Sequence, residues 1–592
     1  MSTAKPRGLP AVWRIAAIFA GFLLSPFSII LSAQQVSDEH TPAERLILSK
    51  LPSGEYADLN ELPAGDRVVH AAFLEELLAG SPPGVKIHWR GVRIRHAVFD
   101  EWVNLAGGVV PYQISIVNSE FKDGLDCANT HFQKGLDLRG DQFKEGTHTR
   151  SNDLPAADFN ATEVAGDADF EDTVFGGFSV FTNAEFSKTA SFERARFEST
   201  KLATFNHIGV KSVAHFDGAV FDGPVVFMGA EIGEQLVLGR ARFKGHTNSS
   251  DFSAMKIGRD LLLVGTVFEG PAKFDASEMD GQLGISEAQF DEGVSLDEIK
   301  TGMAIIVDTA FKKSLSIWDA RLGKLTLKWK DPQGSPEELG ISRTTIQSEL
   351  NIDSLHAKRF FALRAQVQGA ATLNKVEIAE EVDLTGAHFG RLALQKVQLP
   401  KEMKKVSFDH VSYDELNTGD GPRDWEKPIE DLEKSKYSRD NYTRLESYFN
   451  SHGYSERANE VFVHMKRRER REQLGGWWSP RWMAEIALDG LVRYGRSPGR
   501  ALLWSLLVVA AGILVFRREA DMVPQKEGHS PLNFSSFWYS LDLFVPAINL
   551  GVADGWMPRQ GWFLGRNYAR VHRILGWILV PIGLAAMAGL IK

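Results

Sequence analysis

Residues 181–197 have the sequence FTNAEFSKTASFERARF, and the pattern within this stretch decides the fold. The unit apolar-x-x-small-x-apolar occurs there twice, first from Phe181 and again, eleven residues later, from Phe192. The same unit continues in both directions, with small slips, through residues 94–413. Its first apolar residue recurs at Ile94, Ile116, Cys127, Leu138, Phe159, Phe170, Phe205, Phe216, Phe227, Leu238, Phe252, Leu263, Phe274, Ile285, Leu296, Leu363, Leu373, Leu384 and Leu394. The chain is therefore organised around one degenerate repeat.

An eleven-residue period is also the period of a right-handed helical coil, so composition has to decide between helix and strand. The units are rich in Phe, Val, Gly and Thr, and Gly or Asp stands near most corners, which would interrupt a helix in every turn. Aromatic and β-branched residues separated by turn residues are typical of short strands joined by tight turns. The repeat therefore predicts a mainly β protein built from stacked short strands.

The spacing within a unit resembles that of pentapeptide-repeat proteins. Two large apolar residues stand five positions apart, and a small residue precedes the second by two, as at Phe181, Ala184 and Phe186. The resemblance is loose, because regular Ala-Asp-Leu pentads are missing from the sequence. It implies a right-handed parallel β-helix over residues 94–413, a pentapeptide-repeat-like solenoid with about 22 residues per coil and about fourteen or fifteen coils.

Inward-facing columns follow from this fold, because equivalent positions of successive coils stack on one another. The second apolar position predicts one buried aromatic column at Phe121, Phe132, Phe143, Phe175, Phe186, Phe197, Phe221, Phe243, Phe268, Phe290 and Phe311. Small residues are expected where the coil is tight, at Ala184, Ala195, Ala219, Ala230, Ala241 and Ala288. The single cysteine, Cys127, falls at an inward position, so we expect a buried, unreactive thiol and no disulfide scaffold.

The first 93 residues precede the repeat. Residues 1–33 combine a basic start with an apolar run that ends in small residues, which is typical of a secretory signal peptide. The run is also long enough to be an uncleaved N-terminal anchor. Residues 34–93 show helical patterns, with Thr41 and Pro42 as a helix start and an apolar stripe ending at Gly80. We expect this segment to be a helical cap on the first coil.

Residues 145–155 and 328–339 interrupt the repeat and are expected to form projecting loops. Residues 414–437 are charged and contain Pro and Gly, so we expect a linker there. Residues 438–500 carry two amphipathic helical stripes and predict a basic helical hairpin and interfacial segment. A basic cluster followed by tryptophans favours contact with anionic lipid headgroups. These membrane-surface residues are Lys466, Arg467, Arg468, Arg470, Arg471, Trp477, Trp478 and Trp482.

Residues 501–592 predict a membrane domain. Two apolar segments, at about residues 501–518 and 574–591, are candidate spans, and residues 532–552 predict a re-entrant segment between them. Span, re-entrant segment and span resemble the plan of two-helix ion channels. The stretch PAINLG at residues 546–551 replaces the potassium filter, so the sequence does not support potassium selectivity.

Asp542 and Asn549 are the polar residues that we single out within this re-entrant segment. A carboxylate in an apolar membrane segment indicates a functional position. The alternative for Asp542 is a position that faces water or pairs with an arginine such as Arg570 or Arg573. Both interpretations are open from the sequence.

The order of cap, repeat, basic hairpin and two spans, with Arg-Tyr-Gly-x-x-Pro-Gly-Arg at residues 493–500, resembles a bacterial group of membrane-bound repeat proteins. Some members of that group carry the label of membrane-associated oxidoreductase. No Gly-x-Gly-x-x-Gly follows a strand pattern, and a single cysteine excludes Cys-x-x-Cys and haem-attachment motifs. The histidines show no ligand spacing. We therefore predict no catalytic residue, no cofactor and no metal site.

The net charge is −9, and no Lys/Arg stripe follows the repeat, so nucleic acid is not an expected partner. The sequence favours a non-enzymatic, membrane-tethered scaffold or binding protein of the bacterial cell envelope. Its tether would lie in the inner membrane and its repeat domain in the periplasm or outside the cell. Membrane lipids and an unidentified protein or cell-surface molecule are the expected partners.

Two alternatives follow from the same features. An ion-channel-like or sensor protein could be gated through the repeat domain, and such a pore requires a homo-oligomer, so a strict monomer would exclude it. A polysaccharide-acting enzyme could use the long groove of a β-helix. That enzyme would need acids and a basic residue gathered on one face, which the sequence alone does not place.

Overall fold

The structure is a computed structural model that describes residues 40–80, 85–145, 154–245, 250–401, 405–419, 424–474, 479–525, 533–545 and 548–590. The expected signal peptide or anchor at residues 1–33, and also Trp477 and Trp478, lie outside the described residues. The chain forms two compact units, residues 1–201 and 202–592, and each contains part of the repeat.

The first unit begins with the helical cap. Helix α2 (Pro42–Lys50) starts at Thr41, whose hydroxyl accepts a hydrogen bond from the Glu44 amide at 3.2 Å while the Glu44 carboxylate accepts one from the Thr41 amide at 2.8 Å. Helix α3 (Ala71–Ala79) follows. Strand β1 (Ala57–Asp58) pairs in parallel with β2 (Val92–Arg95), so the cap supplies the first rung of the solenoid as well as its cover.

Four short strands make one turn of the solenoid in this unit: β2, β3 (Val98–Phe99), β4 (Val103–Asn104) and β5 (Val109–Val110). The next turn begins with β6 (Ile114–Val117), whose Ile114 lies opposite Val92, 22 positions earlier. The pairing is parallel in every rung that joins these turns. The predicted parallel β-solenoid is confirmed, with about 14 turns.

The eleven-residue period is also a period of the backbone. Ala254, Gly265, Ala276, Glu287 and Glu298 all have positive φ, between 53° and 67°. A left-handed residue turns the chain at a corner, and two such corners in each turn produce the repeat unit. The sequence led us to expect mostly Gly or Asp at the corners, whereas Ala and Glu also occupy these left-handed positions.

The aromatic rings stack inside the solenoid, and all the predicted Phe and Ala positions and Cys127 are buried. In the second unit, Phe221, Phe243, Phe268, Phe290 and Phe311 stack with centroid distances of 4.5–5.3 Å. In the first unit Phe121, Phe143, Phe175 and Phe197 do the same. One part of the prediction is wrong, since Phe132 and Phe186 belong to a different sheet. Eleven residues are half a turn, so alternate units face opposite sides.

The cross-section of the solenoid changes within the second unit. Strand β33 (Glu278–Ser286) pairs with both β29 (Lys256–Ile257) and β30 (Leu261–Val264), so two faces of the earlier turns merge into one long strand. Where a corner separated these two faces in earlier turns, the long strands have a glycine. A Cβ on Gly323 would collide with the carbonyl oxygen of Gly302 one turn earlier.

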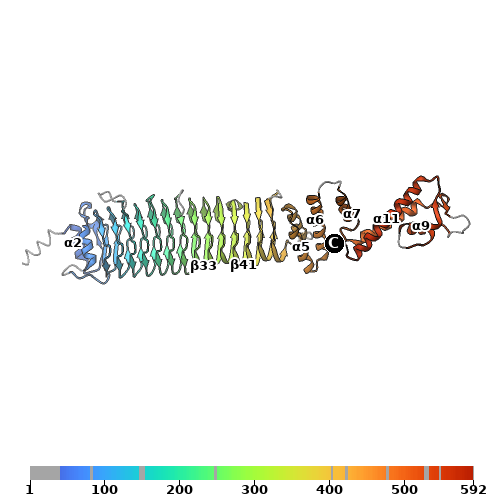
Figure 1. Ribbon diagram of the computed structural model, residues 1–592. Coiled ribbons are helices and arrows are strands. Elements are labelled where there is room, and N and C mark those ends of the chain that lie inside the picture. The colour runs from blue at the N-terminus through green and yellow to red at the C-terminus, as the bar shows by residue number, and fades with distance from the viewer. Residues whose placement is uncertain are drawn as a thin grey trace, which may run out of the picture. The chain divides into compact units, whose positions relative to one another are not determined.

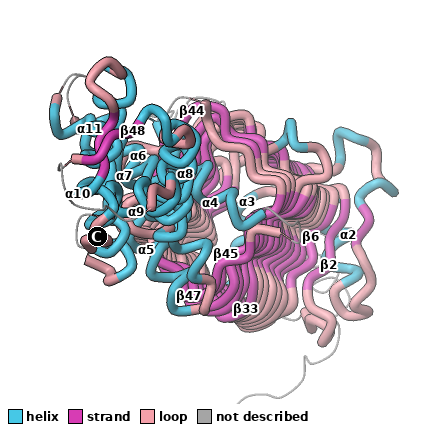
Figure 2. Tube along the Cα trace, turned by 90° about the vertical axis from the view of Figure 1, so that its right-hand side faces the viewer, coloured by secondary structure: helices cyan, strands magenta, loops and turns pink. Residues whose placement is uncertain are grey.

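The sheet that carries the Phe221–Phe311 column ends with β37 (Ala310–Phe311). From that point the described strands alternate between the two remaining sheets. They are β38 (Ser314–Ser316), β39 (Arg321–Lys328), β40 (Glu338–Gly340), β41 (Thr345–Asp353), β42 (His356–Phe361), β43 (Gln366–Asn374), β44 (Glu377–Asp383), β45 (His388–Gln395), β46 (Val406–Ser407) and β47 (Ser412–Asn417). Long strands occur both before and after this point: Figure 1 labels β33 and β41, and Figure 2 labels β33, β45 and β47, which belong to one sheet.

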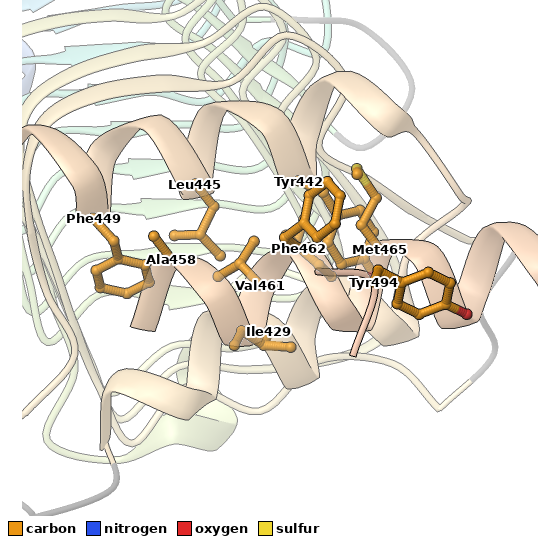
Figure 3. Packing of buried hydrophobic residues seen from close by; sticks show 10 residues of the cluster. Ile429, Tyr442, Leu445, Phe449, Ala458, Val461, Phe462, Met465 and Tyr494 are labelled. Atoms are coloured by element: carbon orange, nitrogen blue, oxygen red, sulfur yellow. The ribbon is translucent and has the colours of Figure 1, made fainter. Parts of the chain in front are cut away.

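Helices follow directly after the last strand. Residues 414–437, expected to be a linker, instead contain the end of β47 and helix α4 (Lys427–Lys434), which packs into the core. Helices α5 (Arg439–Ser451) and α6 (Ser455–Gln473) form the expected hairpin, with Gly453 in the turn at φ 80°. Figure 3 shows Ile429 from α4 with the labelled residues of α5 and α6 in one apolar cluster, against which Phe408, Tyr413 and Leu416 of the last turn also pack.

Among the described residues of the C-terminal part, two helices are long and apolar enough to cross a membrane, α8 (Pro498–Val515) and α11 (Phe563–Met587). They begin earlier in the chain than the expected spans. Helix α7 (Pro480–Val492) precedes them, and α9 (Ser536–Phe544) packs against both. The chain then returns through α10 (Val552–Gly555) to β49 (Trp556–Pro558), which pairs in antiparallel fashion with β48 (Met522–Pro524).

Candidate functional site: the arginine junction

The residues that connect the helical hairpin to the apolar helices form an arginine junction, defined here as Arg467, Arg470, Asp489, Arg493 and Tyr494. Arg467 donates from Nε to Asp489 Oδ2 at 2.9 Å and from Nη2 to Oδ1 at 3.0 Å. Arg470 donates to the Tyr494 hydroxyl at 2.9 Å. Its Nη2 also lies 3.4 Å from Asp489 Oδ2, so two arginines of α6 hold one carboxylate of α7. Burial alone would raise the pKa of Asp489, but the hydrogen bond from Arg467 keeps that pKa below the usual range.

The motif at residues 493–500 makes the bend between α7 and α8. Arg493, Tyr494 and Gly495 have φ values of 48°, 54° and 85°, three consecutive left-handed residues. For Arg and Tyr this conformation costs about 1–2 kcal/mol each. Arg493 offsets that cost with a two-pronged ion pair to Glu460 of α6, at 2.8 and 2.6 Å, and Tyr494 is buried in the cluster of Figure 3. The bend is therefore fixed to the hairpin rather than free to swing.

Arg468 has a structural role that the sequence did not suggest. It is 1% exposed and donates to the carbonyl oxygens of Leu432 and Ser435, to the Tyr442 hydroxyl and, from Nε, to Glu472 at 2.7 Å. A guanidinium held in this way cannot reach lipid, so the membrane-contact prediction for Arg468 is wrong. Arg468 is enclosed by α4 and α5, whereas Arg471, one helical turn later and 62% exposed, only reaches Glu433 at the outer side of α4, at 3.7 Å.

Arg467, Arg470, Arg471 and Trp482 of the predicted surface residues line a pocket of about 580 Å³. It is lined by Glu433, His464, Arg467, Arg470, Arg471, Leu474 and Trp482. Three guanidinium groups face two carboxylates, Glu433 and Asp489, so the cations outnumber the anions. Lys466 lies outside this lining and pairs with Glu469 at 3.3 Å. Guanidinium groups beside an indole can bind a phosphate while the ring contacts acyl or glycerol carbons.

Apolar side chains extend outward next to this pocket. On α7, Met483 and Ile486 are exposed. On α8 and α11 the exposed large apolar residues are Leu502, Leu503, Trp504, Leu506, Leu507, Leu514, Phe563, Leu564, Val571, Ile574, Trp577, Ile578, Leu584 and Met587. Only 17% and 22% of the apolar windows of these two helices are buried within the protein. An exposed apolar surface of this extent is typical of a membrane or protein interaction site.

The two polar residues of the predicted re-entrant segment fix its turn. Asp542 accepts hydrogen bonds from the amides of Leu550, Val552 and Ala553 at 2.7–2.9 Å. Asn549 accepts one from the Gly551 amide at 2.8 Å and donates to Asp554 at 2.9 Å. The carboxylate of Asp542 is thus used to hold the returning chain, an arrangement that the sequence alternatives did not include. Whether this segment forms part of an oligomeric pore stays a prediction.

Sequence reasoning missed the contact that joins α8, α9 and α11. His572 is fully buried, its Nε2 lies 3.0 Å from the Ser540 carbonyl oxygen, and the Ser540 hydroxyl donates to the Val509 carbonyl oxygen at 2.8 Å. Gly512 makes room for both side chains. A small residue on one apolar helix and polar residues on its neighbours are a known signature of helix packing in membranes, and it could have been found in the sequence.

Comparison with known proteins adds no further constraint, since no family model, curated protein or solved structure matches this chain.

Proposed function

We propose that this chain is a membrane-tethered β-solenoid scaffold of the cell envelope, which carries a long, regular binding surface on a fixed helical base. The observation that supports this most is the pair α8 and α11, whose outward surfaces are apolar and which the arginine junction connects to the helical hairpin of α5 and α6. Helix α8 has 18 residues, about 27 Å, which approaches the ~30 Å thickness of a bilayer core.

The arginine pocket supports contact with anionic lipid at this membrane boundary. Trp482, Met483 and Ile486 of α7 supply an aromatic and two apolar side chains near the pocket, as at a membrane interface. A basic side chain near an anionic surface contributes about 1 kcal/mol. Among the predicted surface residues, Arg467, Arg470, Arg471 and Trp482 are those that the pocket brings together.

The solenoid itself supports the scaffold role. In the turns before residue 312 its interior is filled by apolar side chains, and its outer surface carries ion pairs between successive turns such as Lys256–Glu231 and Lys300–Glu278. Placement of the solenoid in the periplasm or outside the cell is part of this proposal, together with a protein or cell-surface partner.

Membrane tethering is tested in cells that express the full chain. Their membrane fraction is isolated and extracted with alkaline carbonate. The chain should stay in the pellet and become soluble only with detergent. The double variant Leu503→Arg/Leu507→Arg, which places two charges on the exposed face of α8, should shift a large fraction to the supernatant. The exposed substitution Arg439→Gln on α5 serves as the matched control. Complete release of the unmodified chain by carbonate would contradict the proposal.

The lipid preference of the pocket is tested by native mass spectrometry of the full chain released from mixed bicelles. Phosphatidylglycerol should be retained over phosphatidylcholine. Arg471→Gln should weaken that retention about fivefold, because one of the exposed cations is removed, while Arg439→Gln should not. Equal retention of both lipids by the unmodified chain would overturn the lipid contact and leave the tethering result standing.

A further inference from the structure

A cavity of about 110 Å³ lies where the solenoid ends and the helices begin. Apolar side chains of the last turns, such as Leu373, Leu384 and Leu392, form most of its wall. Helices α4 and α5 complete the wall with Leu432, Asn441 and Leu445. The cavity therefore lies between two sheets and a helical cover, within one compact unit.

The cavity lies beyond the end of the stacked aromatic column, although Phe360, Phe389, Phe408 and Tyr413 still contribute rings to its wall. The stacked column stops at Phe311. Leu263 and Leu296, inward leucines of earlier turns, are fully buried, whereas Leu384, Leu394 and Leu399 near the end are only half-buried. Aliphatic side chains between two flat sheets leave space that stacked rings would fill.

Asn441 supplies a polar group in this apolar wall. It is 6% exposed, and neither its Nδ2 nor its Oδ1 has a hydrogen-bond partner among the described residues. A buried amide without partners is destabilising by about 1–3 kcal/mol for each unsatisfied group. Its neighbours on α5, Tyr442 and Leu445, face the cluster of Figure 3 and fix the helix in this orientation.

The ligand that fits both features is small, largely apolar and uncharged. A cavity of about 150 Å³ lined by aliphatic and aromatic side chains holds benzene, so 110 Å³ has room for about four or five carbon atoms. An anionic head would approach the Asp431 carboxylate in the same wall, which Lys427 already pairs at 2.8 Å. A charge would also be expensive to desolvate there.

We propose that this terminal cavity binds a short alkyl chain that carries one carboxamide or hydroxyl group, with the polar group hydrogen-bonded to the side-chain amide of Asn441. A carboxamide matches best, because it donates to Oδ1 and accepts from Nδ2 at the same time. The alkyl chain occupies the space between the two sheets. The inference does not depend on the membrane tether.

The test uses the full chain in nanodiscs and 3-fluoropropanamide as the probe, observed by fluorine NMR. The unmodified protein should show a separate or broadened bound resonance that saturates and that unlabelled propanamide displaces. Asn441→Leu should lower the affinity at least tenfold, because it removes both hydrogen bonds. The matched control is Asn450→Leu, an exposed asparagine on the same helix, which should leave the affinity unchanged.

A second variant tests the place of binding. Leu384→Trp, at a half-buried wall position, should fill the cavity and abolish the bound resonance, and circular dichroism of each variant establishes that it is folded. The proposal is overturned by three results: no saturable binding to the unmodified chain, undiminished binding to Leu384→Trp, or equal affinity of the unmodified chain and Asn441→Leu. A loss confined to Leu384→Trp and Asn441→Leu supports it.

Discussion

The turns packed with Phe221 to Phe311 and the terminal turns from β39 to β47 have nearly the same residue period but differ inside. The first are filled by stacked rings, and their inward residues are almost fully buried. The second have two long facing strands, aliphatic side chains and a cavity. The packing of side chains in the interior, rather than the number of residues per turn, therefore distinguishes the fully packed turns of this solenoid from the turns that can accept a ligand.

Removing a ring should have the largest effect, and it should differ between the two regions. Phe243 stacks between Phe221 and Phe268 at 4.9 and 4.5 Å, so Phe243→Ala should destabilise by about 3–5 kcal/mol. Phe360 borders the cavity, so its ring is in contact with fewer neighbouring atoms. Phe360→Ala should therefore lower the free energy of unfolding by only about 2–3 kcal/mol. Denaturant unfolding followed by circular dichroism measures both. Equal losses would remove the distinction between the regions.

The cover of the terminal turns depends on Arg468. Arg468→Met leaves the carbonyl oxygens of Leu432 and Ser435 buried without their donor, so we expect a loss of about 3–5 kcal/mol. Arg471→Met on the same helix is the control, and its exposed side chain should change stability by no more than about 0.5 kcal/mol. The thermal unfolding of the two variants should differ clearly. Similar midpoints would show that Arg468 does not hold the cover.

Asn441→Leu should act in the opposite direction. Without ligand, an apolar side chain in place of an unsatisfied amide should stabilise the chain by about 1 kcal/mol. The measurement is the thermal midpoint without the probe, with Asn450→Leu as the exposed control. A lower midpoint would indicate that Asn441 has a partner and that the terminal turns are packed as well as the earlier ones.

The smallest effect concerns pH. Burial raises the pKa of Asp431 above its usual value, against the hydrogen bond and charge of Lys427. A raised carboxyl pKa in the folded state means that folding binds the proton more tightly, so this term favours the folded state at low pH and is lost as pH rises through the folded pKa. The thermal unfolding midpoint of Asp431→Asn should therefore be higher than that of the unmodified chain at pH 7, and the two midpoints should converge near pH 4. A difference that grows on acidification would contradict this sign.

The repeat made most of the solenoid predictable. A five-residue spacing between large apolar residues and an eleven-residue period indicated short strands joined by tight turns, and the burial of Phe243, Ala241 and Cys127 followed. The assignment of Phe132 and Phe186 to the same column as Phe121 failed because a period alone does not tell how many units complete a turn. The glycines at 302 and 323 were visible in the sequence. The need for glycine at these positions becomes clear only when successive turns are stacked, because the two residues then lie against each other.

The helical part was predictable in kind but not in contacts. Amphipathic stripes located α5 and α6, and hydropathy located α8 and α11, because both depend on neighbours along the chain. The same reasoning predicted that all five basic residues between positions 466 and 471 contact the membrane surface. Only the packing of α4 against α6 separated the buried Arg468 from the exposed Arg471.

The parallel β-solenoid, its inward aromatic residues and the two apolar helices near the C-terminal end can be predicted from the amino-acid sequence, since periodicity and hydropathy are local properties. The merging of two faces, the burial of Arg468 and the position of Asn441 beside an unfilled space become visible only in the folded chain. Those features arise from residues 20 or more positions apart, such as Arg468 and Leu432, which lie 36 positions apart. Their meeting depends on how completely the intervening elements fill the volume between them.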